Sequence, residues 1–236
     1  MPTALRRTLL VTAFGVGGVF WLLMAAGSLL IAWNSLGYIT EGTEHPFVLE
    51  KRPHSEGWFY LVMLWAHIAS GAVVLLAALL QFFRPIVRRW PRFHTALGRA
   101  YVWAMLAVCA PTGFYLALFA KGGWGNAFGF ILLGVVSVWF TWAGWGAARR
   151  RRVTAHRDWM IRSYAMATSS VSFRALHLVF FHLGLPYAQN YELSLWLGLL
   201  LNALAAELLI AAFSLSPRKT PQPQPERNPT HAVLTA

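Results

Sequence analysis

The chain has 236 residues, of which 57% are hydrophobic and only 12% are charged, and its formal net charge at pH 7 is +12. This composition excludes an ordinary soluble domain, whose surface needs more polar residues than this chain supplies. The positive charge does not indicate a nucleic-acid partner, because the basic residues cluster in short segments between apolar runs. The single cysteine, Cys109, excludes an intramolecular disulfide and argues against a zinc ribbon or a thiol redox motif.

Six apolar segments are each long enough to cross a bilayer as a helix. The first resembles a signal peptide, but it lacks a clear small-residue cleavage site, so we interpret it as a retained helix. A polar loop is predicted between the first and second spans, and a Pro-rich, disordered cytoplasmic tail after the sixth. In chain order the predicted segments are span 9–33, loop 34–57, spans 58–83, 99–120, 127–148, 158–183 and 193–215, and tail 216–236.

The distribution of charge predicts how these spans are oriented. An even number of spans places both termini on the same side as the short basic connections after the second and fourth spans. The positive-inside rule makes that side cytoplasmic, and tryptophans near the span ends form the expected aromatic belt. The sequence therefore predicts an all-α, six-helix membrane bundle over residues 1–215, with helices two to five as its core and helices one and six outside.

Two histidines lie at matching depths in the second and fifth predicted spans. His67 lies about nine residues, and His177 about eight, from the same predicted membrane boundary, roughly 12 Å to 13 Å at the α-helical rise. Small and weakly polar residues continue both helix faces, which is typical of faces that turn toward other helices or a cofactor. The pair can supply the axial imidazoles of a low-spin haem, with Arg174 on a propionate or a quinone oxygen. The alternative is an interhelical hydrogen bond from each histidine.

A second pair, His94 and His156, lies at the cytoplasmic boundary beside arginines that include Arg99 and Arg162. These residues can bind a second haem, form a polar pocket for a quinone, or contact lipid phosphates. Glu207 lies inside the sixth span, where an unpaired carboxylate is costly, and Arg162 is its expected partner by depth. His182 is expected near the outer surface, either at the interface or as an alternative ligand.

Four segments carry a resemblance to a known family: LWAH at 64–67, QFFR at 81–84, HTALGRAY at 94–101 and HRDWMIRSY at 156–164. The chain resembles bacterial predicted membrane proteins of the domain-of-unknown-function group twenty-three-oh-six over about residues 57–183. This resemblance implies the architecture and a bacterial inner membrane location, but no established activity.

The chain is also similar, more distantly, to two-haem cytochromes of the b561 and ferric reductase kind, in which four helices hold haem between histidines. His67, a basic connection and then His94 follow that layout. The chain departs from it because residues 127–148 contain no histidine, so ligands on four successive helices cannot be carried over. Two haems, one or none are therefore left open.

From these observations we expect a b-type haem electron-transfer protein. His67 and His177 would bind the iron, and a cluster of His94, Arg99, His156 and Arg162 would receive a quinone or another electron donor. The alternative is a haem-free membrane protein that binds a lipid or small solute, or that scaffolds a larger complex. A metal-dependent hydrolase is less well supported, because Asp158 is the one carboxylate near the cytoplasmic histidines in the sequence. The expected partners are membrane lipids and either a quinone or a redox protein.

Overall fold

The computed structural model describes residues 3–52 and 54–215, without the side chains of residues 3–10, 13, 14, 16 and 84. Over that part of the chain the secondary structure is helical and contains no strand. Five helices are long and apolar enough to cross a membrane, which confirms an all-α membrane protein. The predicted tail lies outside the described residues. The first is Gly17–Thr40, which takes in most of α1 (Thr3–Asn34) and runs on through α2 (Gly37–Thr40). The others are α4 (Trp58–Gln81), the helix that joins α6 (Pro91–Trp103) to α7 (Ala110–Ala117), α8 (Trp124–Arg149) and α11 (Tyr187–Leu215).

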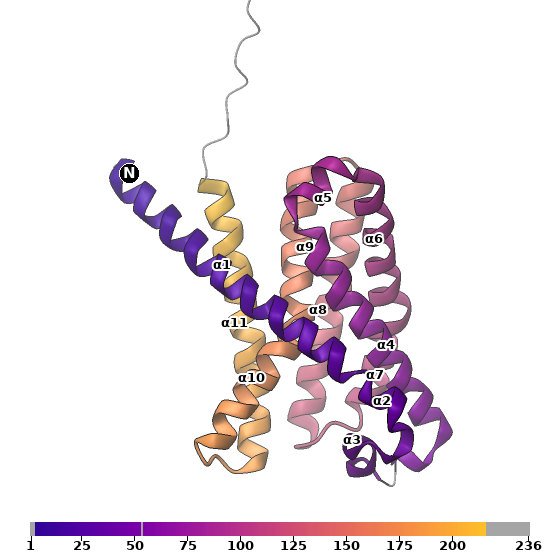
Figure 1. Ribbon diagram of the computed structural model, residues 1–236. Coiled ribbons are helices and arrows are strands. Elements are labelled where there is room, and N and C mark those ends of the chain that lie inside the picture. The colour runs from indigo at the N-terminus through magenta and orange to yellow at the C-terminus, as the bar shows by residue number, and fades with distance from the viewer. Residues whose placement is uncertain (1–2, 53, 216–236) are drawn as a thin grey trace, which may run out of the picture.

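The fifth predicted span is divided, so the continuous helix predicted over residues 158–183 is wrong. It forms α9 (Val153–Ala167) and α10 (Ser169–His182), with Thr168 between them. The Thr168 hydroxyl donates to the carbonyls of Tyr164 and Ala165, at 3.0 Å and 3.1 Å. Hydroxyl side chains that compete for main-chain carbonyls in this way bend helices. The division sends α10 away from the line of α9 (Figure 1).

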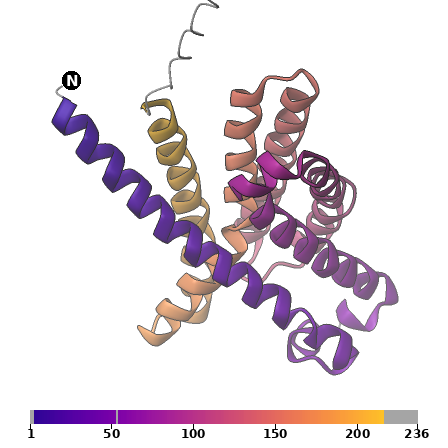
Figure 2. The ribbon, with the colours of Figure 1, turned by 45° about the horizontal axis from the view of Figure 1, so that its top comes forward.

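The helices form two groups. In the first, α4, the α6–α7 helix, α8 and α9 surround a common core. The α6–α7 helix packs against α4 and α8, whereas α9 packs mainly against α8 and α11 and only lightly against α4, so α6 and α9 lie on a diagonal of this group. In the second, α10 packs against α11, and α1 crosses α4, α10 and α11 (Figures 1 and 2). Helices two to five were predicted to form the core. That prediction fails for α10, because the chain bends at Thr168 and α10 packs against α11 instead of the four-helix group.

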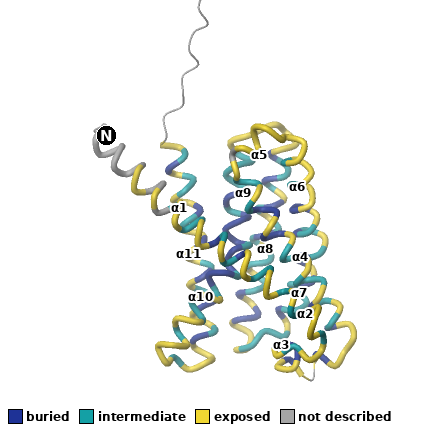
Figure 3. Tube along the Cα trace, viewed as in Figure 1, coloured by how far each residue is buried: buried dark blue, intermediate teal, exposed yellow. Residues whose placement is uncertain are grey.

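The centre of the four-helix group combines apolar packing with a buried hydrogen-bonded chain. Tyr101 is fully buried, and its hydroxyl lies 2.7 Å from that of Ser163 on α9. The Ser163 hydroxyl lies 2.7 Å from the Thr141 hydroxyl of α8. The Thr141 hydroxyl donates a hydrogen bond to the Ser137 carbonyl. Buried polar groups are costly unless they are paired, so this chain fixes α6, α8 and α9 relative to one another. Buried positions concentrate around mid-height, where α1 crosses the bundle (Figure 3).

The third predicted span starts earlier than expected and contains a wide turn. Its helix begins at Pro91 instead of residue 99, so His94 lies inside α6 and not at its mouth. A π-helical segment, Ala104–Cys109, separates α6 from α7, and Pro111 follows within the first turn of α7. Proline has no N–H to donate, and a single wide turn of this kind accommodates it. The turn makes main-chain carbonyls available to neighbouring side chains.

The connection predicted as a polar loop is instead folded into short helices. Its apolar residues cover the end of α4: Val48 is 2% exposed and packs with Tyr60 and Leu64. The Lys51 ammonium donates to the Phe119 carbonyl at 2.9 Å, and burial lowers its pKa. The charges of this connection predicted a solvated loop, so its buried apolar residues were not expected. The short helices are α2 (Gly37–Thr40), η1 (Gly42–Glu44), α3 (Pro46–Glu50) and η2 (His54–Glu56).

The two ends of the molecule differ in charge. The basic end carries α5 (Arg84–Arg89) and the arginine turn at residues 149–152, and α1 begins and α11 ends there (Figure 1). The acidic end carries the short helices between α1 and α4, whose residues include Glu41, Glu44 and Glu50. This arrangement agrees with the predicted relation between the described ends of the chain and the basic turns. The cytoplasmic assignment of the basic end stays a prediction.

Candidate functional sites at the two ends of the bundle

His67 on α4 is held by the α7 side of the bundle. Its Nδ1 lies 2.9 Å from the Cys109 carbonyl and 3.2 Å from the Thr112 hydroxyl. A Cβ at Gly113 would lie 3.0 Å from the His67 ring, so the glycine makes room for it. With Nδ1–H donating to the carbonyl, Nε2 keeps its lone pair, and it has no hydrogen bond among the described residues. Metal-binding histidines are oriented by a second-nitrogen contact of this kind.

His177 on α10 lies among aromatic side chains of α10 and α11. Its ring is parallel to Phe173, with centroids 5.8 Å apart, and meets Tyr187 and Tyr191 edge-on. Its Nδ1 is buried without a hydrogen-bond partner among the described residues. No hydrogen bond or ring contact joins His177 to His67 within the same residues, because the division at Thr168 directs α10 toward α11. The pairing of His67 with His177 as haem ligands therefore stays a prediction.

Arg174 lies between the two groups of helices at the acidic half of the molecule. Its Nη1 donates to the Ser170 carbonyl at 3.0 Å, and the side chain keeps accessible surface although protein surrounds it. It forms no ion pair within the described residues. The side chains close enough to interact with its charge are Tyr38 from α2, Tyr191 from α11 and His67 from α4. Arg174 therefore lies within electrostatic reach of residues from both groups of helices.

His94 on α6 and His156 on α9 both lie at the basic end of the molecule (Figure 1). The two imidazoles are close enough to interact electrostatically, although they come from α6 and α9, which lie on a diagonal of the bundle. His156 Nδ1 lies 2.9 Å from the Gly144 carbonyl of α8, which repeats the arrangement of His67. His94 Nδ1 is buried without a partner in the described part of the chain. Gln81 donates to the His94 carbonyl at 2.8 Å and ties α4 to α6.

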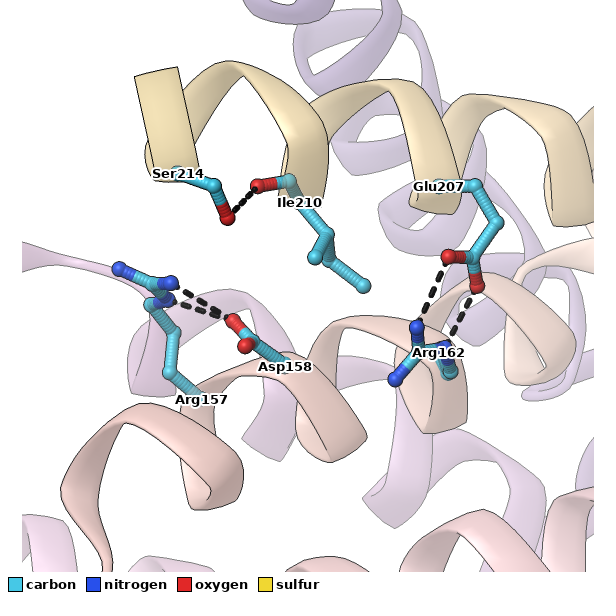
Figure 4. Close-up of polar contacts among 6 residues, drawn as sticks. All are labelled: Arg157, Asp158, Arg162, Glu207, Ile210 and Ser214. Carbon is cyan, nitrogen blue, oxygen red and sulfur yellow. Dashed lines mark hydrogen bonds and ion pairs between the residues drawn. The ribbon is translucent and has the colours of Figure 1, made fainter. Parts of the chain in front are cut away.

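The two arginines predicted to join this pair lie elsewhere. Arg99 is exposed and lines a shallow hollow on the outer face of α6 with Arg92 and Thr95. Arg162 forms two hydrogen bonds to Glu207 of α11, at 2.5 Å and 2.8 Å (Figure 4). The pairing of Arg162 with Glu207 is thus confirmed. The predicted four-residue cluster is separated, with its histidines between helices and its arginines on other faces.

Other predicted positions have simpler surroundings. His182 is exposed at the end of α10, where its Nδ1 lies 2.8 Å from the Leu178 carbonyl. No group of three or more His, Cys, Asp or Glu side chains in the described part of the chain is arranged to hold a metal ion. A haem needs two axial ligands and does not require such a group.

Sequence reasoning missed the polar residues that position the sites. Asn202 is fully buried on α11 and bonds four groups of α9, α10 and the Thr168 turn. Tyr38 and Tyr191 approach Arg174 from helices far apart in the sequence. Asn202 had a usable signal, since an amide in an apolar span must bond to another helix. The two tyrosines had none, because tyrosines near span ends are expected in any membrane protein.

The described helices define a multi-pass integral membrane protein. A family model described as "Predicted membrane protein (DUF2306)" matches residues 64–210, and the chain belongs to this family. The resemblance noted in the sequence is thereby confirmed, while the comparisons give no support to a relationship with cytochrome b561. No curated protein and no solved structure is similar enough to the chain to count as a match.

Proposed function

We propose that this protein is a b-type haem electron-transfer protein whose axial ligands are His94 and His156. The proposal is supported by the placement of both histidines at the basic end of the four-helix group, near enough for their charges to interact, with the His156 ring oriented by the Gly144 carbonyl. Neither histidine has a hydrogen bond at Nε2 among the described residues, so the Nε2 atom of each ring is available to a ligand. Two imidazoles from opposite helices are the donor set of a low-spin haem.

Residues of this chain would orient the imidazole of His156 and the main chain at His94. The Gly144 carbonyl accepts from His156 Nδ1, which leaves the lone pair on Nε2 and fixes the ring plane. Gln81 holds the main chain of α6 at His94. The buried Nδ1 of His94 lacks a partner in the described part of the chain, so the ring is free to adjust when a ligand binds. A bound haem would supply one-electron transfer.

The proposal extends to location and partners. The basic end would face the cytoplasm of a bacterial inner membrane, where its arginines contact anionic lipid head groups. The electron donor would be a quinone or a redox protein that approaches that end. His67 has the same carbonyl-held Nδ1 as His156, so a second haem that uses His67 and His177 belongs to the same proposal as its less supported part.

The test is an absorption spectrum of the detergent-purified full chain, oxidised and dithionite-reduced, after expression with added haem precursor. We expect a Soret band that is lost in His94→Ala and in His156→Ala. It should be retained in His54→Ala, which removes an exposed histidine of the acidic end. Loss of the band in His67→Ala and His177→Ala alone would transfer the haem to the other pair. A wild-type protein that binds no haem, even after incubation with haemin, would overturn the function.

A further inference from the structure

Arg174 lies near the middle of the membrane-spanning part of the molecule. The next residue toward the N-terminus, Phe173, approaches α11 so closely that a Cβ at Gly198 would lie 3.2 Å from its main-chain nitrogen. Gly198 follows Tyr187, the first residue of α11, by eleven residues, or about 16 Å along the helix. A hydrocarbon core is about 30 Å thick. A cation at this depth is costly unless it faces a partner, so it marks a functional position.

The described part of the chain supplies no carboxylate for this cation. Arg174 has no ion pair among the described residues, whereas Arg162 on α9 is neutralised by Glu207. At the acidic end, Glu50 is paired with Lys121. Within residues 3–52 and 54–215 the Arg174 guanidinium forms a single hydrogen bond, to a carbonyl of its own helix, which leaves its remaining N–H groups free. An arginine side chain carries five N–H donors in one plane, and this geometry suits a carboxylate or phosphate that accepts two hydrogen bonds.

Two phenol donors lie within electrostatic reach of Arg174. The hydroxyls of Tyr38 and Tyr191 interact electrostatically with Arg174, and neither has a hydrogen bond among the described residues. They come from opposite sides, since Tyr38 belongs to α2 over the end of α4 and Tyr191 to α11. Tyr191 is held in place by Phe173, whose ring centroid is 4.9 Å away.

We propose that Arg174, Tyr38 and Tyr191 bind the acidic group of an anionic amphiphile, a carboxylate or phosphate attached to an acyl chain. The guanidinium forms a charge-assisted pair with the oxyanion, and the two phenols donate to it. The aromatic side chains of α10 and α11 provide an apolar wall for the chain next to the head group. A small hydrated anion would lose its water on entering at this depth, whereas an amphiphile enters from the surrounding leaflet.

This proposal does not rest on haem binding, because its residues lie at the acidic half and the proposed haem ligands at the basic end. It assigns a ligand to the Arg174 guanidinium, which takes no part in the proposed His94–His156 haem site. The two proposals therefore have separate readouts. Arg174→Gln is expected to retain the Soret band of the His94–His156 haem, and loss of that band would show that Arg174 serves the haem.

The experiment is a binding titration of the detergent-purified full chain with three probes, followed by native mass spectrometry and tryptophan fluorescence. The probes are oleate, dioleoyl phosphatidic acid and inorganic phosphate. We expect one oleate or one phosphatidic acid per chain and no retained inorganic phosphate. The carboxylate and phosphate head groups are distinguished by which amphiphile binds more tightly.

Variants give the decisive comparison. Arg174→Gln should weaken amphiphile binding at least about tenfold, since charged hydrogen bonds are the strong ones. Tyr38→Phe and Tyr191→Phe, which keep the shape of the site, should each weaken it by about threefold to tenfold. Arg157→Gln removes the same charge from an arginine that is already paired with Asp158, so it should bind as wild type does.

Three results would overturn the proposal. The first is unchanged binding in Arg174→Gln together with both tyrosine variants. The second is an equal loss in Arg157→Gln, which would mean that net charge alone attracts the amphiphile. The third is retention of inorganic phosphate as tightly as phosphatidic acid, which would remove the role of the acyl chain. If Arg174→Gln does not fold, the two phenylalanine variants decide the matter.

Discussion

α9 and α10 are the two halves of one predicted helix, and they hold their arginines in opposite settings. Arg162 on α9 is bound by the Glu207 carboxylate, so its charge is neutralised within the protein. Arg174 on α10 has no carboxylate among the described residues and faces neutral tyrosines. Both lie in a chain whose helices cross a bilayer, where an unpaired charge is costly. The comparison separates a structural arginine from one that is available to a ligand.

A single neighbour, α11, produces this difference. Gly198 and Asn202 are four residues apart and share a face of the helix, whereas Glu207, five residues further, points in another direction. Gly198 meets α10, Asn202 meets the division at Thr168, and Glu207 meets α9. The carboxylate partner is therefore supplied to α9 alone, while α10 packs closely on the backbone of α11. Changes at these three positions should reveal how much each half depends on α11.

The largest effect is expected at Asn202, where the two halves meet. Asn202→Leu leaves the Ala165 carbonyl and the hydroxyls of Ser169 and Ser172 without this partner, and should lower the free energy of unfolding by about 3 kcal/mol. The measurement is SDS-induced unfolding from mixed micelles, followed by tryptophan fluorescence. Asn34→Leu, at the exposed end of α1, is the control and should change little. A loss at Asn202 below about 0.5 kcal/mol would mean that the division does not need its amide.

A smaller effect is expected where α10 alone contacts α11. A Cβ at Gly198 would lie 3.2 Å from the Phe173 nitrogen, and main-chain atoms cannot move aside as a flexible side chain can. Gly198→Ala should therefore push α10 from α11 and cost about 2 kcal/mol in the same unfolding assay. Gly146→Ala on α8 meets nothing within 4 Å and serves as the matched control. Equal stability of the two variants would contradict close packing of α10 on α11.

The contrast between α9 and α10 also marks the limit of what the sequence predicts. Apolar length and charge placement located the spans, because a bilayer imposes both on any helix that crosses it. The fifth span looked continuous for the same reason, since its length and periodicity suit one helix. Its division depends on Thr168 and on an amide at Asn202, about thirty residues further along the chain. A contact between distant segments is not visible in the pattern of one segment.

The candidate sites follow the same rule. Depth along a helix correctly matched Glu207 with Arg162, because both positions follow from residue counting. Depth also matched His67 with His177, but depth does not give the direction in which a side chain points. The π-helical turn before Pro111 gives His67 the carbonyl of Cys109, and the division at Thr168 turns His177 toward Tyr191. Both events are local irregularities that a regular helix template omits.

The ion pair of α9 allows a third, smaller test. Arg162→Gln and Glu207→Gln should each destabilise the protein, and the double variant should be no worse than either single one. The coupling energy expected from the double-mutant cycle is about 1 kcal/mol, kept low because Glu207 is 56% exposed. A coupling near zero would remove the distinction between a satisfied Arg162 and an unsatisfied Arg174. Unfolding in mixed micelles at low and high salt provides the measurement.

The smallest effect is expected at the helix contact that holds His67. Alanine normally stabilises a helix interior by up to about 1 kcal/mol relative to glycine. Gly71→Ala on α4 should show this gain, because its Cβ meets nothing within 4 Å. Gly113→Ala should gain less than half as much, since its Cβ would press on a His67 ring that is bonded to Cys109. Equal gains at the two positions would mean that the ring moves freely, and that the Cys109 carbonyl does not hold His67 ready for a ligand.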